Sequence, residues 1–96
     1  MKRTPLTGDD LARAIAALPG WSVENGKLHR EFRFPDFVRA FAFMSAAALV
    51  AEARDHHPEW SNVYNRVVVD LTTHDAGGIT QSDVDFAQTM NELAGS

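Results

Sequence analysis

The chain has 96 residues, enough for a single domain over residues 1–96 and too few for two. Apolar residues make up 45% and charged residues 23%, which excludes a disordered chain, and a net charge of −4 with scattered basic residues argues against direct DNA or RNA binding. Cysteine is absent, which excludes a disulfide framework, a thiolate metal site and a cysteine nucleophile, and fits a reducing cytoplasm.

The first predicted element is a short helix after Thr7. This residue is a favourable N-cap, and Leu11, Ile15 and Leu18 follow at helical spacing. The Pro-Gly pair at residues 19–20 ends the helix. Strands are then predicted at residues 21–24 and 27–34, because the Asn-Gly pair between them is the strongest short signal for a hairpin turn.

The second of these strands has one apolar side. Leu28, Phe32 and Phe34 alternate with polar residues, so one face of the sheet is expected to cover the core while the other meets water or a ligand. Arg30 interrupts the apolar side.

Residues 37–51 form the next predicted helix, in which only Arg39 and Ser45 are polar. The stretch is shorter than the roughly 20 apolar residues of a membrane span, so no membrane span is expected. A helix that is apolar on all sides must be buried on all sides, which a chain of this size cannot achieve alone. We therefore expect one side to pack on the sheet and the other on a second copy of the chain, in a homo-oligomer.

The rest of the chain is predicted to form another hairpin and another helix. Strands are expected at residues 59–63 and 67–73, with a turn at 64–66 and a loop at 74–78. Thr80 and Asp83 match a capping box at the start of the last helix. The order α-β-β-α-β-β-α predicts an α+β fold of two layers, a four-stranded antiparallel sheet with helices packed on one face.

Three histidines lie at the ends of predicted elements. Pro58 disfavours helical geometry in the residue before it, so the long helix should end near residues 55–57, with His56 and His57 at its C-terminus. The negative end of the helix dipole favours imidazolium there, which suits a proton donor. His74 follows a strand and would point to the open face of the sheet if the strand continued by one residue.

Other interpretations of these residues stay open at this point. Helix capping would explain His56 and His57, and His74 would then be a loop residue. A three-histidine zinc site is a further alternative, although adjacent histidines seldom reach one ion and no His-x-x-x-His spacing supports it. Three more residues have structural alternatives: the capping box for Asp83, a solvated helix surface for Glu52 and the core for Trp60.

Seven residue types at fixed gaps resemble the signature of the pterin-4a-carbinolamine dehydratase family. The stretches at residues 58–60 and 62–65 resemble the family too, as do the chain length and the order of elements. The matching residues are Glu52, His56, His57, Pro58, Tyr64, His74 and Asp83.

The resemblance implies a lyase that dehydrates 4a-hydroxytetrahydrobiopterin, the pterin left by aromatic amino-acid hydroxylases, to quinonoid dihydropterin. This reaction needs a proton for the departing 4a-hydroxyl and the removal of one from N5, which is work for imidazoles near neutral pH. The resemblance implies neither a metal nor a redox cofactor. His56 and His74 would transfer protons on either side of the ring, and His57 would bind the pterin or deprotonate N5.

The resemblance also implies a set of substrate-binding residues and an assembly. Glu52 and Asp83 would orient histidines or support the pocket, and family members resemble each other in forming tetramers through the long helix. In animals the family resembles a dimerisation cofactor of a homeodomain transcription factor, so a non-enzymatic partner-binding role is the alternative. The backbone around Thr72, Thr73 and Asp75 would bind the amide edge of the pterin, and Trp60 would form a wall of the site.

Overall fold

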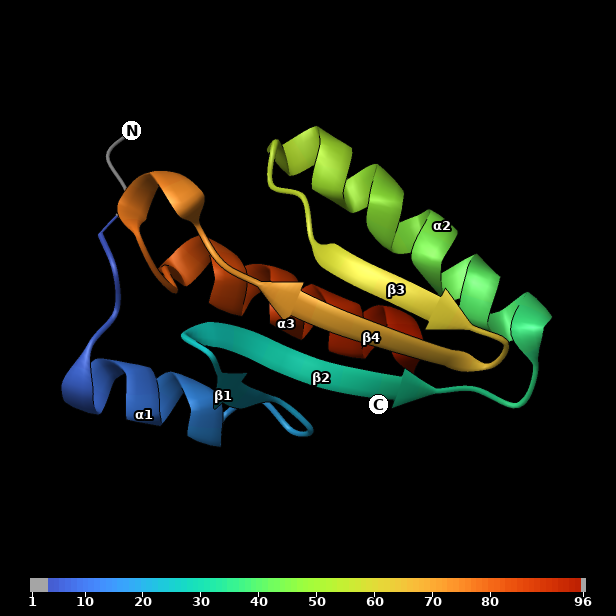
Figure 1. Cartoon of the computed structure of the whole chain (residues 1–96), viewed down its shortest axis with the longest axis horizontal. Coiled ribbons are helices and arrows are strands. Elements are labelled where there is room, and N and C mark those ends of the chain that lie inside the picture. The colour runs from blue at the N-terminus through green and yellow to red at the C-terminus, as the bar shows by residue number, and fades with distance from the viewer. Residues whose placement is uncertain (1–3, 96) are drawn as a thin grey trace.

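A computed structural model of the chain describes residues 4–95. Its elements follow the predicted order, with one short 3₁₀ helix, η1, added before the last helix (Figure 1). The elements are α1 (Gly8–Ala16), β1 (Ser22–Glu24), β2 (Lys27–Arg33), α2 (Phe37–Arg54), β3 (Glu59–Val63), β4 (Arg66–Leu71), η1 (His74–Ala76) and α3 (Gln81–Ala94).

The strands of residues 4–95 form one antiparallel sheet in the order β1-β2-β4-β3. The predicted turn between β1 and β2 is confirmed, because Asn25 and Gly26 both have positive φ angles of 53° and 75°. The two hairpins join through the pairing of β2 with β4, in which Leu28 lies opposite Leu71 and Phe32 opposite Val67.

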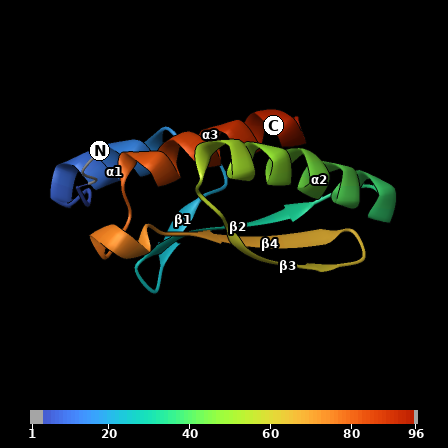
Figure 2. The same ribbon diagram turned by 90° about the horizontal axis from the view of Figure 1, so that it is seen from above.

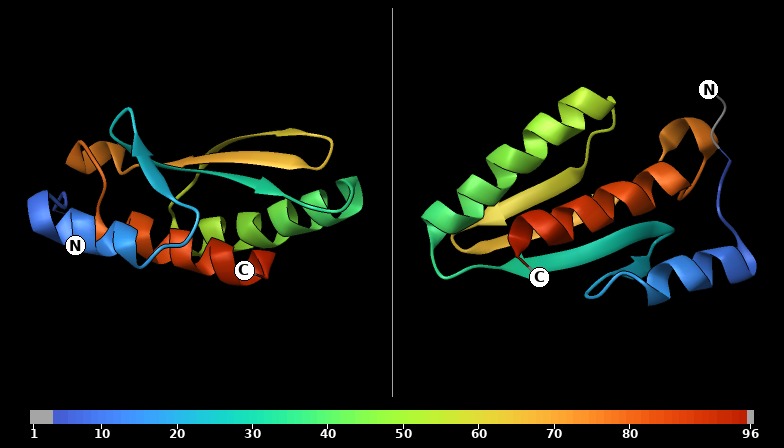
Figure 3. Two further views of the ribbon diagram at one scale, coloured as in Figure 1. Left: turned by 90° about the horizontal axis from the view of Figure 1, so that it is seen from below. Right: turned by 180° about the vertical axis from the view of Figure 1, so that it is seen from behind.

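Within the described residues, α1, α2 and α3 lie on one face of this sheet, as the sequence predicted, and η1 lies at its end (Figures 2 and 3). The alternation expected for β2 is present, since Leu28 and Phe32 are buried while Glu31 and Arg33 are exposed. The hydrophobic core fills the space between the layers. It includes Leu28 and Phe32 of β2, Val67, Val69 and Leu71 of β4, Ala40, Phe43 and Ala47 of α2, and Phe86, Ala87 and Met90 of α3.

The α2 helix begins at the predicted residue, runs through the apolar stretch to Arg54 and has Asp55 as its C-cap, close to the end that Pro58 predicts. Its buried side chains recur every three or four residues and include Phe43, whereas Phe41 and Leu49 on the other side are 54% and 75% exposed. The structure thus leaves an apolar side of α2 uncovered in a single copy of the chain. No helix of residues 4–95 is both long enough and apolar enough to cross a bilayer.

The second hairpin differs from its predicted boundaries. Arg66 pairs with Val63 inside the sheet, so the turn consists of residues 64–65 instead of 64–66. The β4 strand ends at Leu71, two residues early, and the predicted loop at residues 74–78 contains η1. The reason is that the carbonyl of Thr73 accepts hydrogen bonds from Ala76 and Gly77, which curls the chain away from the strand ladder.

Arg30, the residue that interrupts the apolar side of β2, is accommodated at the edge of the core. Its guanidinium lies 4.2 Å from the centroid of the Phe32 ring and donates to Asn91 Oδ1 at 2.5 Å. It also donates to the Pro19 carbonyl at 3.1 Å. Gly20 follows with a φ of 85°, and a Cβ there would approach Arg30 Nε to 2.7 Å, so this turn requires glycine.

Candidate active site

A cavity of about 190 Å³ lies where α2 ends and β4 leaves the sheet. Two hydrogen bonds end α2 beside this cavity. Asp55 N donates to the Glu52 carbonyl at 3.2 Å, and His56 N donates to the Ala51 carbonyl at 3.0 Å. Asp55 takes the left-handed conformation, with φ of 51°, and turns the chain toward the sheet. The cavity is lined by Asp55, His56, His57, Thr72, Thr73, His74 and Asp75.

His56 belongs to a buried polar network at this cavity. Its Nε2 lies 2.5 Å from Oδ1 of Asp83, a side chain with no exposed surface. The other oxygen, Oδ2, accepts hydrogen bonds at 2.8 Å from the Thr80 backbone N–H and from the Thr73 hydroxyl. The predicted capping box of Thr80 and Asp83 is confirmed, and the same carboxylate also faces His56. Asp83 therefore joins the start of α3 to the histidine at the end of α2.

His57 lies on the outside of the same turn. Its Nε2 is 2.9 Å from Oε1 of Glu52, and both side chains are mostly exposed. Water competes for both groups at such a position, so this contact is weaker than the buried one between His56 and Asp83.

His74 begins η1 and has a carboxylate partner that the sequence did not indicate. Its Nε2 is 3.1 Å from Oε2 of Glu59, and Oε1 of Glu59 accepts a hydrogen bond from Lys27 Nζ at 2.5 Å. The hydrogen bond with Lys27 lowers the pKa of Glu59 below its ordinary value, and the same bond raises the pKa of Lys27. Strand parity alone places Lys27 and Glu59 on the open face, but their proximity depends on the pairing register of β2, β4 and β3.

The other predicted substrate-binding residues lie either at the cavity or against the core. Thr72 and Asp75 line the cavity, and Thr73 lines it while its side chain is buried. Trp60 is half-buried and packs against the hydrophobic core, opposite Val69 in the sheet.

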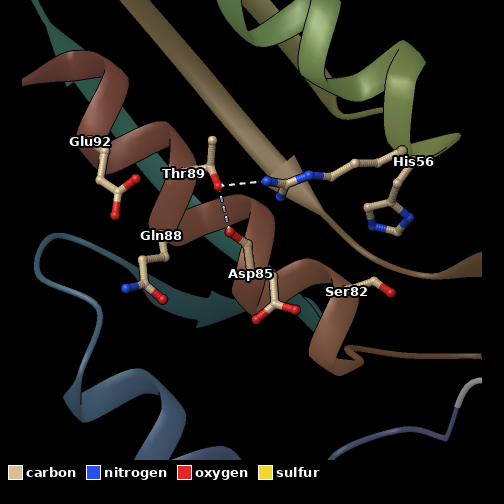
Figure 4. A pocket seen from close by; sticks show the side chains of 7 residues that line it. His56, Ser82, Asp85, Gln88, Thr89 and Glu92 are labelled. Carbon is tan, nitrogen blue, oxygen red and sulfur yellow. Dashed lines mark hydrogen bonds between the residues drawn. The ribbon is translucent and has the colours of Figure 1, made fainter.

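A larger cavity, of about 570 Å³, lies on the other side of His56 between the end of α2 and α3 (Figure 4). Its walls are polar and include Ser82 and Asp85, and Arg54 of α2 donates to the Thr89 hydroxyl at 3.1 Å across it. His56 therefore lies between two hollows, and its partner Asp83 is covered from both of them.

Each of these three histidines has its own carboxylate neighbour and faces one cavity. Among residues 4–95 no three His, Asp or Glu side chains are grouped so as to hold a metal ion. Imidazoles that are held separately around one hollow suit a reaction in which different atoms of a single ligand gain and lose protons. The protein thus has an α+β fold with three histidines from two elements at one cavity.

The chain belongs to the pterin 4 alpha carbinolamine dehydratase family, whose model matches residues 4–93. It is 55% identical over 91 residues to a provisionally named pterin-4-alpha-carbinolamine dehydratase of Solibacter usitatus, covering 95% of this chain and 96% of that one. A second protein with the same provisional name, from Rhizorhabdus wittichii, is 53% identical over 96 residues, with 98% and 99% covered.

Two solved structures are similar to this fold. One, described as a transcriptional coactivator/pterin dehydratase from Brucella melitensis, superposes with a TM-score of 0.92 at 47% identity and covers 95% of this chain and 99% of its own. The other, a pterin dehydratase-like protein described as a RuBisCO assembly factor in the alpha-carboxysome, has a TM-score of 0.66 at 25% identity, with 79% and 88% covered. Proteins of this fold therefore carry descriptions of more than one role.

Proposed function

We propose that the protein is a 4a-hydroxytetrahydrobiopterin dehydratase that recycles the pterin used by aromatic amino-acid hydroxylases. The observation that carries this proposal is the cavity that His56, His57 and His74 line, after the end of α2 and at the start of η1. Membership of the family supports the choice of a pterin as the ligand. The cysteine-free sequence suits a reducing cytoplasm as its location.

The proposed reaction is an elimination of water. The C4a–O bond breaks as an imidazolium protonates the leaving hydroxyl, and a neutral imidazole removes the proton from N5 as the C4a=N5 double bond forms. One proton is donated and one is accepted, so the reaction consumes no oxidant or reductant. We assign these transfers to His56 and His74 on either side of the ring, and binding or N5 deprotonation to His57.

The remaining cavity residues have supporting roles in this proposal. The backbone at Thr72, Thr73 and Asp75 would bind the amide edge of the pterin. Asp83 has no exposed surface, so we propose that it orients His56 and does not contact the substrate. Glu52 would orient His57, and Trp60 would support the wall of the site from the core.

The test is a direct assay of 4a-hydroxypterin dehydration with purified variants. Because neighbouring imidazoles and water can partly replace one another, His56→Ala or His74→Ala alone should slow the reaction less than the two together. A positioned acid or base contributes about 10²- to 10⁴-fold, so the double variant should lose most of the acceleration. Circular dichroism should show that it is folded, and wild-type turnover by the folded double variant would refute the assignment.

We also propose that the protein is a homo-oligomer assembled through α2, and the family resemblance favours a tetramer. The uncovered side of this helix carries Phe37, Val38, Phe41 and Leu49, which are 46% to 75% exposed. Wet apolar surface costs about 25 cal/mol per Å², and a symmetric partner presents the same stripe. The occupant we propose is therefore a second copy of the chain.

Charged substitutions on the two sides of α2 test this assembly. Leu49→Glu should yield a smaller, folded species in light scattering, because Leu49 is 75% exposed in the single chain. Phe43→Glu, the matched substitution on the buried side, should instead unfold the protein, because Phe43 is 4% exposed. A wild-type protein that is monomeric at micromolar concentration would contradict the proposal.

The second candidate function is a non-enzymatic one, in which the same side of α2 binds another protein. The observation that favours it is the uncovered apolar stripe together with the coactivator description of the Brucella protein. The two functions use different surfaces and can be separated. If the folded Leu49→Glu variant keeps dehydratase activity but no longer binds a partner protein that wild type binds, the protein has both functions. If wild type has no dehydratase activity, the partner-binding function is the one that remains.

A further inference from the structure

Glu59 contacts Lys27 and His74, one with each of its carboxylate oxygens. Oε1 accepts from Lys27 Nζ at 2.5 Å and Oε2 lies 3.1 Å from His74 Nε2. Glu59 is the first residue of β3, Lys27 is the first residue of β2, and β4 runs between them. The lysine therefore reaches diagonally across β4 on the open face of the sheet to meet the carboxylate at the edge of the cavity.

His74 needs such a contact because packing does not fix its ring. Its side chain is 76% exposed, and an exposed imidazole exchanges among several rotamers. His56, in contrast, is fixed by burial and by Asp83. His74 is the most exposed of the three cavity histidines, and Glu59 is a side chain within hydrogen-bonding distance of its ring.

We propose that Glu59 is a positioning residue for His74 and that Lys27 holds the Glu59 carboxylate in place for this task. This inference rests on the proposed dehydratase function. When Nε2 of His74 donates to Glu59, its proton stays on that nitrogen and Nδ1 is left as the atom that exchanges a proton with the substrate. A carboxylate behind an imidazole also stabilises the cation that forms when the ring takes up a proton.

The ionic state of Glu59 supports this arrangement. Its pKa lies below the ordinary value because Lys27 donates to it, so the carboxylate stays charged through the range in which imidazoles titrate. Other titratable groups around His74 are Asp55, His56, His57 and Asp75, which line the same cavity. Asp70 adds to the charge near Lys27, and its side chain lies 2.8 Å from His29 on the open face.

Three variants test the chain of contacts. Glu59→Gln keeps the shape but removes the charge, and it should lower kcat about tenfold with KM little changed. This is comparable to the smaller losses, about tenfold, that follow when the carboxylate partner of a metal-bound histidine is removed. Lys27→Met should lower kcat less, and should have no further effect in the Glu59→Gln background. Lys27→Arg, which restores a cation, should recover most of the activity.

The matched control is Glu31→Gln on the same face of the sheet. Glu31 is also a partly exposed glutamate with cationic partners, since Arg33 Nε lies 2.8 Å and Arg66 3.6 Å from its oxygens. It belongs to the part of β2 that is remote in register from Lys27, so Glu31→Gln should keep wild-type kcat and KM.

Two readouts separate positioning from a merely structural contribution. In ¹³C NMR without substrate, the carboxyl of Glu59 should titrate at a higher pH in Lys27→Met than in wild type, because the cation that lowers its pKa is gone. Nuclear Overhauser contacts of the His74 ring should change in Glu59→Gln and stay unchanged in Glu31→Gln. The fall in kcat without a rise in KM is the kinetic counterpart.

The outcomes distinguish this inference from the proposed function. If wild type dehydrates the pterin but Glu59→Gln keeps full kcat and unchanged His74 contacts, the positioning role is wrong and the function stands. If wild type has no dehydratase activity while both NMR changes occur, the function is wrong and the Lys27–Glu59–His74 arrangement stands as a structural one. An additive effect of Lys27→Met in the Glu59→Gln background would overturn the role given to Lys27.

Discussion

The buried pair of His56 and Asp83 and the exposed pair of His74 and Glu59 place the same two chemical groups in opposite surroundings. His56 is 7% exposed and Asp83 is 0% exposed, whereas His74 is 76% and Glu59 is 41% exposed. Asp83 is bonded within the fold, at the start of α3 and through Thr73. Glu59 is instead held by the flexible side chain of Lys27.

The side chains on one side of the cavity are therefore coupled to the stability of the fold, whereas those on the other side can change with little effect on it. A buried charged group is costly when its partner is removed, because water cannot replace the lost hydrogen bonds. An exposed pair contributes little to stability and is screened by salt. Substitutions at the buried pair should therefore lower both the free energy of unfolding and the activity, whereas those at the exposed pair should change activity with stability nearly unchanged.

The largest expected effect is that of Asp83→Asn. An amide cannot serve His56, Thr73 and the Thr80 N–H as the carboxylate does, and removing one partner from a buried hydrogen-bonded pair costs about 3 kcal/mol or more. Urea denaturation followed by circular dichroism measures the loss. Asp85→Asn, on the exposed side of the same helix, is the control and should stay within about 0.5 kcal/mol of wild type. Equal stability of Asp83→Asn and Asp85→Asn would show that the buried contact of Asp83 with His56 does not stabilise the fold more than an exposed group does.

Thr73→Val should have an intermediate effect. The substitution keeps the shape of a buried side chain but removes the hydroxyl that donates to Asp83 and contacts the Thr80 hydroxyl at 2.8 Å. The loss of a hydrogen bond to a charged group predicts about 2 kcal/mol of destabilisation in the same denaturation experiment. Thr72→Val, at the half-buried neighbouring position, should cost less, and the reverse order would show that Asp83 does not depend on Thr73.

The smallest expected effect on stability is that of Glu59→Gln, and it should depend on pH. Because the folded-state pKa of Glu59 is lowered, its contribution is complete above the unfolded-state pKa and is lost as pH falls through the folded-state value. Thermal melts of the variant and wild type should therefore differ slightly at neutral pH and converge in acid. A difference that grows in acid would contradict the sign of this pKa shift.

Local patterns in the sequence predicted those parts of the fold that local physics determines. The turn at Asn25 and Gly26, the alternation in β2 and the capping box of Thr80 and Asp83 all depend on residues close together in the chain. The early end of β4 was missed because it depends on hydrogen bonds that Thr73 makes after leaving the ladder.

The candidate site could be predicted only in part for the same reason. The histidines stood out because they lie at the ends of elements, but their partners depend on tertiary contacts. Glu59 is 32 residues from Lys27 and 15 from His74, and its oxygens meet both only after β3 and β2 have paired with β4. Trp60 was a candidate for the site or for the core, and the pairing of β3 with β4 places it against the core.

The 27-residue separation between His56 and Asp83 affects the order in which parts of the protein fold. The entire β3–β4 hairpin lies inside the loop that this contact closes, so we expect the contact to form after the hairpin has folded. Contacts that close long loops form late, because chain entropy opposes them until the intervening structure is in place. During refolding, helical circular dichroism should recover first, and the capacity to act on a substrate should return last.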